Sequence, residues 1–427
     1  MRNISDFFKN ELCDFSCYST IRMISSSIDG LKNSQRKLIY TAIDKLKSET
    51  KVSQFSGIAA IYSEYLHGNL DGVIQNLTAD YCGANNIPLF KGEGNFGSRF
   101  VNAPSAARYI FIDRPKYFDN IFDIKDVLIN QYFEGEKIEP LFYVPSIPIL
   151  VANGSPGAIA TGFKQHILPR NIKDIIKYLK GEKIKLIPYF NNFKGKIYQG
   201  ENDSQWIIEG TFIRQNKKII IQEIPIWTEY KKYLEILDKL EEDKKIKGYN
   251  DLSNTKTDEY KFEILGIEKL SDDDIIELLK LRRKETEIYN AINRENKVQT
   301  FNNIYEILDY YKEIRKEFME LQRKFDLSKL NENLEISKNK YIFVLLIIQD
   351  KLKVFKRNKV DIKNDLKSLG LSPFDDFEYL LKMPIHSFTN ETLKDLDSKV
   401  KDLESEISKL QNLNLEKDWL NKLSLNF

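Results

Sequence analysis

The stretch NSQRKLIYTAIDKLK, residues 33 to 47, decides how the N-terminal region folds. Asn33 or Ser34 can cap a helix here, because their side-chain oxygens can accept hydrogen bonds from free backbone N–H groups. The apolar residues recur at helical spacing: Leu38, Ala42, Ile43 and Leu46. The other side of the stretch is basic, so it predicts an amphipathic helix with one buried and one positively charged face.

The neighbouring segments extend this pattern. A second helix is expected after His67-Gly68, with Asn69 as its cap, and a β-rich segment punctuated by glycines follows. Short helices followed by such a segment favour a winged helix-turn-helix. We assign it to residues 1–165.

The character of the sequence changes twice beyond this region. Residues 166–295 mix helical and extended runs and predict a separate α/β domain. Residues 296–427 contain two apolar seams with alternating spacings of three and four, which indicate a coiled coil. The seams are Ile304, Ile307, Tyr311, Ile314, Phe318, Leu321 and Phe325, then Leu396, Val400, Leu403, Ile407 and Leu410. An antiparallel pair within one chain would leave the apolar tip YIFVLLII, 341–348, as a contact surface, whereas an ordinary helical bundle is the alternative.

Bulk composition narrows the function classes only slightly. The 65 basic and 63 acidic residues nearly cancel, so net charge alone points to no polyanionic partner. Basic residues are nevertheless concentrated between residues 31 and 51. Three cysteines and three histidines lack the spacing of a disulfide framework or a zinc site, which fits a reducing cytosol. The longest apolar run, 341–348, is too short to span a bilayer, and we expect a cytoplasmic protein with no membrane partner.

Two apparent ligand motifs have simpler explanations. Gly92 to Gly97 satisfies GxGxxG, but the following SRFVNAPSAA has no helical periodicity, and a dinucleotide fingerprint must open a helix. Ser271 to Asp274 resembles a metal-binding cluster, yet it precedes IIELLKLRRK and is better interpreted as a helix cap with acids in the first turn.

A different set of residues suits phosphoryl transfer to tyrosine. Its members are Arg22, Lys32, Arg36, Lys37, His67, Arg108 and Tyr109. A phenol is a weak nucleophile at neutral pH. A phosphodiester under its attack gains negative charge on the non-bridging oxygens, which fixed arginine and histidine donors can stabilise. The resulting phosphotyrosine ester keeps the energy of the broken bond, so resealing needs no cofactor.

Five ordered segments resemble a known family. They are DGLKNSQRKLIY (29–40), YLHGN (65–69), NNIPLFKGEGNFGSR (85–99), AARYIF (106–111) and PSIPILVANGSPGAIATGFKQHILPRN (145–171). In order and approximate spacing they resemble the breakage-reunion (gyrase A-like) subunit of type IIA DNA topoisomerases. The compact layout is most similar to the medium subunit of T-even bacteriophage topoisomerases.

The resemblance implies roles for individual residues. Tyr109 matches the nucleophile that becomes linked to a DNA 5′-phosphate, with Arg108 as its neighbouring cation. Arg22 and His67 match residues placed at the scissile phosphate. Lys32, Arg36, Lys37 and Arg99 align with DNA contacts. Ile159 matches the isoleucine that wedges between base pairs, and Ala158 is the alternative because NGSPGAIATG is one residue longer than the family pattern.

The resemblance also implies an architecture and partners. We expect an α+β multidomain protein with a winged-helix DNA-gate domain (1–165), a tower domain (166–295) and a coiled coil with a helical C-gate dimerisation tip (296–427). Such subunits form homodimers through the DNA gate and C-gate. Mg²⁺ and ATP would be bound by ATPase/Toprim partner chains, in a heterotetramer or heterohexamer, and not by this chain. A phage origin would place the complex in the cytoplasm of a bacterial host.

Other functions explain fewer of these features. A non-catalytic winged-helix DNA-binding protein with a coiled-coil dimerisation arm would use Arg22, Lys32 and Arg36 only for phosphate affinity, and it leaves AARYIF unexplained. A recombination nuclease with the same tyrosine and winged helix would lack the long tower and paired helices. A tyrosine recombinase would carry its nucleophile near the C-terminus.

Overall fold

The computed structural model describes residues 4–216 and 218–426. It groups them into two compact units: unit 1 takes in the chain up to Lys316 and from Trp419 onward, and unit 2 is Glu317–Asp418. The mixed α and β composition agrees with the expected fold class. The grouping differs from the three expected segments, because residues 1–165 and 166–295 fall within one unit.

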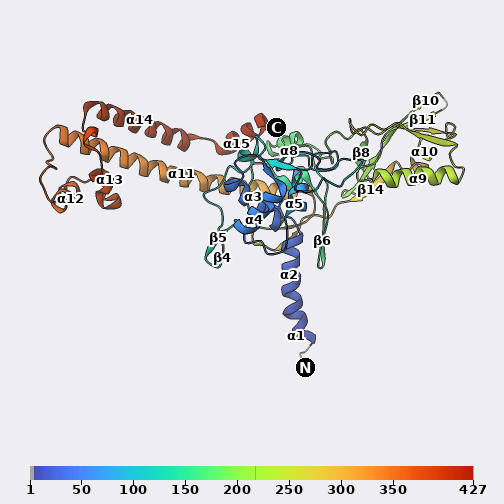
Figure 1. Cartoon of the computed structure of the whole chain (residues 1–427), viewed down its shortest axis with the longest axis horizontal. Helices are drawn as coiled ribbons and strands as arrows, with labels where there is room; N and C mark the ends of the chain where they lie inside the picture. The colour runs from blue at the N-terminus through green and yellow to red at the C-terminus, as the bar shows by residue number, and fades with distance from the viewer. Residues whose placement is uncertain (1–3, 217, 427) are drawn as a thin grey trace. The chain divides into compact units, whose positions relative to one another are not determined.

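Unit 1 begins with two helices, α1 (Ile4–Lys9) and α2 (Glu11–Met23), which extend away from the rest of the unit (Figure 1). Three further helices pack on one another: α3 (Asn33–Lys45), α4 (Val52–Tyr62) and α5 (Asp71–Thr78). A small antiparallel sheet accompanies them in the order β1-β3-β2, formed by β1 (Thr50–Lys51), β2 (Lys91–Glu93) and β3 (Phe111–Asp113). The helix expected over 33–47 is confirmed as α3.

The expected caps of these helices are displaced. Helix α3 already includes Asn33, and its N-cap is Lys32, whose backbone N–H donates to the Gln35 side chain at 2.9 Å. Helix α5 begins after Leu70 rather than after Asn69. Boundary errors of one or two residues are usual when several polar residues stand near a helix start.

Short elements connect this region to the rest of unit 1. The helices are α6 (Phe118–Ile121), α7 (Ile149–Asn153) and α8 (Ile172–Leu179). Three antiparallel hairpins are β4 (Gln131–Phe133) with β5 (Glu136–Ile138), β6 (Ser155–Ala160) with β7 (Phe163–Ile167), and β15 (Asn290–Ile292) with β16 (Val298–Thr300).

Residues 196–286 of unit 1 form two antiparallel sheets. The first has the order β14-β9-β8, with β8 (Lys196–Gln199), β9 (Gln205–Glu209) and β14 (Arg282–Thr286). The second has the order β10-β11-β13-β12, with β10 (Thr211–Gln215), β11 (Lys218–Glu223), β12 (Gly248–Asp251) and β13 (Phe262–Leu265). Helices α9 (Tyr230–Glu242) and α10 (Asp272–Leu278) share a buried core with the second sheet.

Pairing between distant segments explains why the first two expected segments form one unit. Ser26 forms a parallel bridge with Ile292, and His166 forms an antiparallel bridge with Ile288. The buried Arg170 side chain also donates to both carboxylate oxygens of Glu287, at 3.1 and 2.7 Å. Residues 288–292 therefore pair with segments on both sides of the boundary expected at residue 165.

Helix α11 (Ile304–Ile348) starts in unit 1 and continues into unit 2. The first part of its predicted seam is buried in unit 1, where the Tyr311 hydroxyl donates to Pro145 O at 2.6 Å. Arg315 pairs there with Asp123 at 2.6 Å, and its guanidinium lies 5.8 Å from the ring centre of Trp419. Trp419 belongs to α15 (Leu415–Asn426), and its indole donates to Ser146 O at 2.7 Å. The start of α11 is thus held within unit 1 by these contacts.

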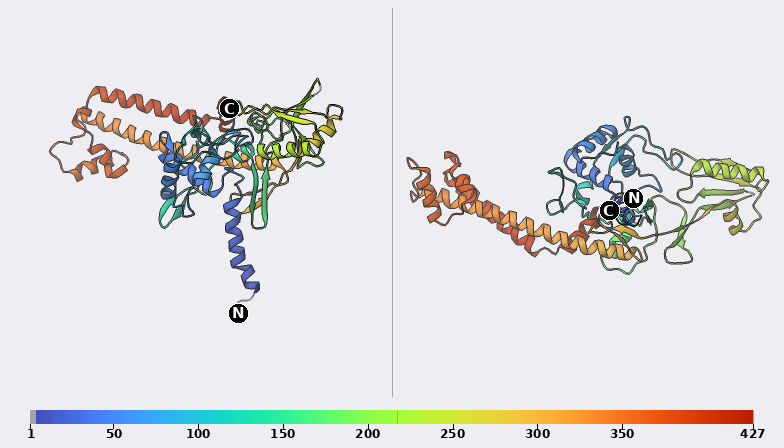
Figure 2. Two further views of the ribbon diagram at one scale, coloured as in Figure 1. Left: turned by 45° about the vertical axis from the view of Figure 1, so that its right-hand side comes forward. Right: turned by 90° about the horizontal axis from the view of Figure 1, so that it is seen from below.

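Unit 2 is helical. It contains α12 (Lys359–Ser368), the 3-10 turns η1 (Phe374–Phe377) and η2 (Ile385–Ser387), α13 (Glu378–Leu381) and α14 (Asn390–Asn412). Helix α14 lies beside the unit 2 part of α11 (Figures 1 and 2). Lys338 pairs with Glu404 at 2.6 Å and Arg323 donates to Leu413 O at 3.4 Å, so the two helices are antiparallel.

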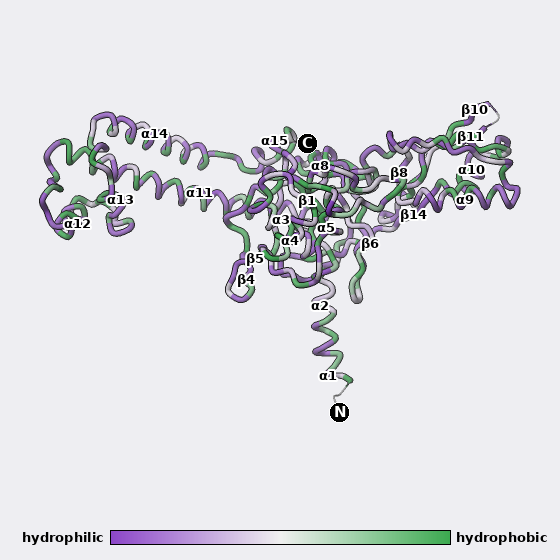
Figure 3. The backbone as a smooth tube through the Cα atoms, in the orientation of Figure 1, coloured by the Kyte–Doolittle hydropathy of each residue, from purple (hydrophilic) through white to green (hydrophobic). Residues whose placement is uncertain are grey.

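The seam residues of unit 2 differ in burial. Leu321 is 38% exposed, whereas Phe318 of α11 and Ile407 of α14 are buried. The helix alternates between hydrophilic and hydrophobic colour along its length (Figure 3). A paired coiled coil therefore stays a prediction. In the expected tip, Phe343 and Val344 are buried but Ile342 is 39% exposed, and further exposed apolar residues of unit 2 include Phe355, Val360 and Ile385.

Candidate functional site

Tyr109 lies on an exposed turn immediately before strand β3. Its backbone N–H donates to Ala106 O at 2.9 Å, and its side chain is 66% exposed. The next residue, Ile110, and Ile112 of β3 are both buried. An exposed phenol is thus fixed beside a chain segment that is anchored in the core.

Helix α4 holds this turn on both sides of Tyr109. The backbone N–H of Ser53 donates to Ala107 O at 3.2 Å, and that of Val52 donates to Ile110 O at 3.0 Å. These N–H groups lie in the first turn of α4, where they have no acceptor within the helix. The carbonyl groups of the turn therefore accept hydrogen bonds from the free N–H groups at the start of α4. The same hydrogen bonds limit the movement of the turn.

The glycine-rich stretch packs beneath the same turn. Gly94 has φ of +104°, and a Cβ atom there would lie 2.7 Å from Cγ2 of Ile110. No helix begins between β2 and α6 in this described part of the chain, so the expectation that no helix follows the GxGxxG is confirmed. The glycine is required by its backbone conformation and by the close approach of Ile110.

Arg108 places a cation next to the phenol. Its guanidinium carbon lies 4.8 Å from the centre of the Tyr109 ring. A guanidinium at this distance interacts favourably with the ring face, and it remains a donor for an anion approaching the hydroxyl.

Arg22 and His67 are brought together by a residue that the sequence did not single out, Tyr18. The Tyr18 hydroxyl lies 2.9 Å from Nε2 of His67 and accepts from Nη1 of Arg22 at 3.5 Å. Tyr18 and Arg22 are one turn apart on α2, and His67 lies in the loop between α4 and α5. The hydrogen bonds of the described residues connect this cluster but do not join it to Tyr109.

The basic residues around α3 have unequal environments. Arg36 is buried and donates to both oxygens of Asp29, at 2.7 and 3.2 Å. Lys37 is buried against Glu139, at 2.8 Å, and also donates to Ser63 O. Lys32 is half-buried, and within the described part of the chain no carboxylate pairs with it. Burial lowers the pKa of the Lys32 ammonium. Of the three, Lys32 has the most available charge.

The Arg99 side chain is also buried and paired with a carboxylate. Its guanidinium donates to both oxygens of Glu223, at 3.1 and 2.5 Å, and lies 4.5 Å from the ring centre of Tyr260. The Tyr260 hydroxyl donates to Arg99 O at 3.0 Å. Arg36, Lys37 and Arg99 were all expected to contact DNA. The geometry instead gives each a buried carboxylate partner, so direct phosphate contact by these three is not favoured.

The β6–β7 hairpin presents Ile159 to solvent. Ile159 is 65% exposed, whereas the adjacent Ala158 is 5% exposed and packs near Ile24 and Ile292. Successive side chains of a strand point to opposite faces. The register of the hairpin shifts between Ser155 and Ala158, so an irregularity accommodates the extra residue of this loop. Of the two wedge candidates, Ile159 is the exposed one.

The acidic stretch before α10 has structural partners. Ser271 is the N-cap and accepts from the backbone N–H of Asp274 at 3.2 Å. Asp272 pairs with Arg214 and Asp273 with Arg282. The helix-cap interpretation is confirmed. In residues 4–216 and 218–426, no group of three or more His, Cys, Asp or Glu side chains is arranged to hold a metal ion.

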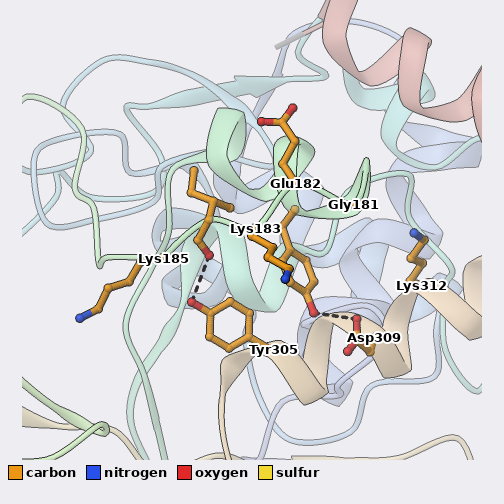
Figure 4. Close-up of a pocket in the computed structure, with 9 residues that line it drawn as sticks. Gly181, Glu182, Lys183, Lys185, Tyr305, Asp309 and Lys312 are labelled. Atoms are coloured by element: carbon orange, nitrogen blue, oxygen red, sulfur yellow. Dashed lines mark hydrogen bonds between the residues drawn. The ribbon is translucent and has the colours of Figure 1, made fainter.

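A separate cavity of about 600 Å³ lies between the end of α8 and the start of α11 (Figure 4). Tyr178 donates to Asp309 at 2.9 Å, and Tyr305 donates to Ile184 O at 3.3 Å. Burial and the Asp309 carboxylate raise the pKa of Tyr178 to about 12, so its hydroxyl keeps the proton. The residues that line the cavity include none of the expected site residues.

Three hydrogen-bond partners of the expected site residues were not predicted from the sequence, and only one of them had a local sequence signal. Tyr18 stands four residues before Arg22, and this spacing on a helix places two side chains on one face. Glu223 gave no signal, because it lies 124 residues from Arg99 along the chain. Asp29 belongs to a quoted motif, yet its burial could not be read from the sequence.

Among the helices of residues 4–216 and 218–426, none has both the length and the apolarity that a membrane span requires.

The curated proteins that are similar to this chain include several DNA topoisomerases 2. The chain is 33% identical to DNA topoisomerase 2 of Invertebrate iridescent virus 6, over 98% of this chain and 38% of the relative. It is 31% identical to DNA topoisomerase 2 of Plasmodium falciparum, over 97% and 34%. The chain thus spans about a third of the length of these curated relatives.

A solved structure and a family model agree with these relatives. The crystal structure of the Plasmodium falciparum topoisomerase II DNA-binding, cleavage and re-ligation domain superposes with a TM-score of 0.86 at 30% identity, covering 98% of this chain and 63% of that one. The family model for the A subunit of DNA gyrase/topoisomerase IV matches residues 22–426. Because that match covers nearly the whole chain, this protein belongs to the family of DNA gyrase/topoisomerase IV A subunits.

Proposed function

We propose that this chain is the DNA-gate subunit of an ATP-dependent type II DNA topoisomerase. It would cut both strands of one duplex through a transient link to tyrosine, allow a second duplex to pass, and reseal the break. One observation supports this most: Tyr109 is exposed on a turn fixed by the core, in a member of this family.

The proposed reaction begins with attack of the Tyr109 hydroxyl oxygen on a backbone phosphorus. A P–O bond to tyrosine forms while the bond from phosphorus to the 3′ oxygen breaks. The phenolic proton is lost, and the leaving 3′ oxygen gains one. The products are a 5′-phosphotyrosine and a free 3′-hydroxyl. Attack by that hydroxyl reverses each change and needs no further energy source.

Three exposed groups suit the charge that develops in this step. Arg108 lies against the Tyr109 ring, and the Tyr18 hydroxyl connects Arg22 with His67. We assign Arg108, Arg22 and His67 as donors to the non-bridging phosphate oxygens, because fixed donors stabilise a transition state with little reorganisation. In a homodimer, Tyr109 and these donors need not come from the same chain.

We assign the DNA contacts to the candidate side chains that are accessible to solvent. Lys32 is the preferred phosphate contact of α3, and Ile159 is the preferred wedge between base pairs. We reassign Arg36, Lys37 and Arg99 as supports that hold the DNA-binding surface in shape through buried ion pairs.

The proposed reaction also requires Mg²⁺, ATP and further protein chains. Among residues 4–216 and 218–426, no cluster of three or more His, Cys, Asp or Glu side chains could hold a metal ion. From the family resemblance we propose that Mg²⁺ and ATP are bound by ATPase/Toprim partner subunits, and that two copies of this chain dimerise through the DNA gate and the C-gate. The bacterial cytoplasm is the proposed setting.

Tyr109→Phe tests the proposal. The variant is expected to bind duplex DNA like the parent protein, but with Mg²⁺ and the partner subunit it should form no covalent protein–DNA adduct after denaturation in detergent. Tyr132→Phe is a matched control, because Tyr132 is another exposed tyrosine, in β4, and should leave adduct formation intact.

Two outcomes would reject the assignment. Adduct formation by Tyr109→Phe would show that another residue is the nucleophile. DNA binding without any adduct in the parent protein, under conditions in which the partner subunit is active, would favour the non-catalytic winged-helix alternative.

A further inference from the structure

Tyr18 occupies an unusual place for an aromatic residue. Its side chain is 50% exposed, so packing in the core does not explain it. Its hydroxyl instead contacts two groups of opposite hydrogen-bonding character. Nε2 of His67 lies 2.9 Å away, and Nη1 of Arg22 lies 3.5 Å away.

The Arg22 hydrogen bond has one possible direction, whereas the direction of the His67 hydrogen bond depends on the tautomer of the imidazole. A guanidinium can only donate, so a lone pair of the Tyr18 oxygen accepts from Arg22. The single Tyr18 O–H is then free to donate to Nε2 of His67. In a neutral imidazole, a nitrogen that accepts is unprotonated, and the proton resides on the other nitrogen. With the Tyr18 O–H directed at Nε2, the His67 proton resides on Nδ1, for which the described residues provide no hydrogen-bond partner.

We propose that Tyr18 is a positioning residue of the cleavage site: it fixes His67 as the Nδ1–H tautomer, with that N–H available to a phosphate oxygen, and holds Arg22 beside it. This inference rests on the proposed function. It concerns a residue outside the five segments that resemble the family, because those segments begin at residue 29.

The surroundings make such positioning physically reasonable. The Ser19 hydroxyl, adjacent to Tyr18, accepts from both the backbone N–H and the hydroxyl of Thr161, at 3.4 and 3.3 Å. Thr161 lies in the turn of the hairpin that carries Ile159. Helix α2 therefore contacts the His67 loop and the hairpin with two consecutive residues, which restrains the Tyr18 hydroxyl.

A direct test observes the histidine nitrogens. The chain has three histidines, so selective ¹⁵N labelling gives a simple spectrum, and His67→Gln identifies the His67 signals by their loss. When its imidazole is neutral, His67 of the parent protein is expected to show a protonated Nδ1 and an unprotonated Nε2. Tyr18→Phe removes the hydroxyl but keeps the ring, and should convert His67 to a mixture of tautomers.

Tyr65 provides the matched control. Its ring packs edge-on against His67, with centroids 5.8 Å apart, but among the described residues no hydrogen bond joins the two side chains. Tyr65→Phe should leave the His67 tautomer unchanged. An Nε2–H tautomer in the parent protein, or an unchanged spectrum in Tyr18→Phe, would overturn the inference.

Adduct formation gives a second, independent measurement. With Mg²⁺ and the partner subunit, Tyr18→Phe should form the covalent adduct about tenfold more slowly at saturating DNA, with unchanged DNA affinity, as expected for one lost hydrogen bond to a donor used in the transition state. If the parent forms no adduct, the proposed function fails. If the parent forms it and Tyr18→Phe matches its rate, only the positioning role fails.

Discussion

The cations of the first 110 residues occupy two contrasting environments. Arg22, Arg108 and His67 are exposed and contact aromatic groups. Arg36, Lys37 and Arg99 are buried and paired with Asp29, Glu139 and Glu223. Both sets lie in segments that resemble the family or next to them, so a motif match alone does not separate an exposed cation from a buried one. The proposed division into DNA contacts and scaffold supports rests on burial and on the presence of a carboxylate partner.

The largest effects are expected when two arginines, one buried and one exposed, are replaced by alanine. Arg36→Ala leaves the carboxylate of Asp29 buried without its cation, which should lower the free energy of unfolding by about 3–5 kcal/mol. Arg22→Ala should change stability little, because Arg22 is exposed, but it should slow adduct formation about a hundredfold. Thermal unfolding and adduct assays on both variants measure this. Equal loss of stability in the two variants would break the distinction.

The turn beneath Tyr109 gives the next largest effect. Gly94→Ala forces a Cβ against Ile110 at a positive φ, and should cost about 1–3 kcal/mol of stability and displace Tyr109. Gly57→Ala is the control: Gly57 lies in α4, and a Cβ there would meet nothing within 4 Å. That change should stabilise the helix slightly. Thermal unfolding separates them, and a neutral Gly94→Ala would show that the turn is not constrained as described.

The hairpin allows a comparison of adjacent residues. Ile159→Ala should keep the stability of the parent but reduce DNA bending, measured by energy transfer across an end-labelled duplex. Ala158→Leu should destabilise by about 1–3 kcal/mol, because Ala158 is buried and a larger side chain overpacks its site. Unchanged bending in Ile159→Ala would exclude it as the wedge.

The smallest expected effect concerns Lys32. Since its pKa is lowered in the folded state, folding disfavours the charged form, and stability should rise as the pH increases through that lowered pKa. Lys32→Met should therefore be slightly more stable near neutral pH, yet bind DNA with a salt slope reduced by about one. Lys37→Met should instead destabilise, because it leaves Glu139 buried and unpaired. A fall in stability for Lys32→Met would reverse our interpretation of Lys32.

Local patterns allowed much of this structure to be predicted. The helix α3, the cap at Ser271 and the absence of a helix after Gly97 each follow from residues adjacent in sequence. The exposure of Ile159 rather than Ala158 also agrees with strand alternation. These features depend on short-range geometry, which a single sequence contains.

Long-range pairing could not be predicted. Arg99 and Arg36 resemble DNA-binding cations in sequence, and only the folded chain shows Glu223 and Asp29 beside them. The seam starting at Ile304 has a related limit: heptad spacing shows which helix face is apolar, but not whether a second helix or the body of unit 1 covers it. The division at residue 165 likewise ignored the bridge between Ser26 and Ile292.

The contact between Arg315 and Trp419 has a consequence for modularity. These residues stand just outside the two ends of unit 2, and the guanidinium lies 5.8 Å from the indole ring centre. Unit 2 is therefore an insertion whose entry and exit points in unit 1 are neighbours. Residues 317–418 could be replaced by a linker of a few residues without pulling either end from its site. The chain is in this sense a continuous domain that hosts a second one, so a unit 2 from a relative could be grafted at the same pair of positions.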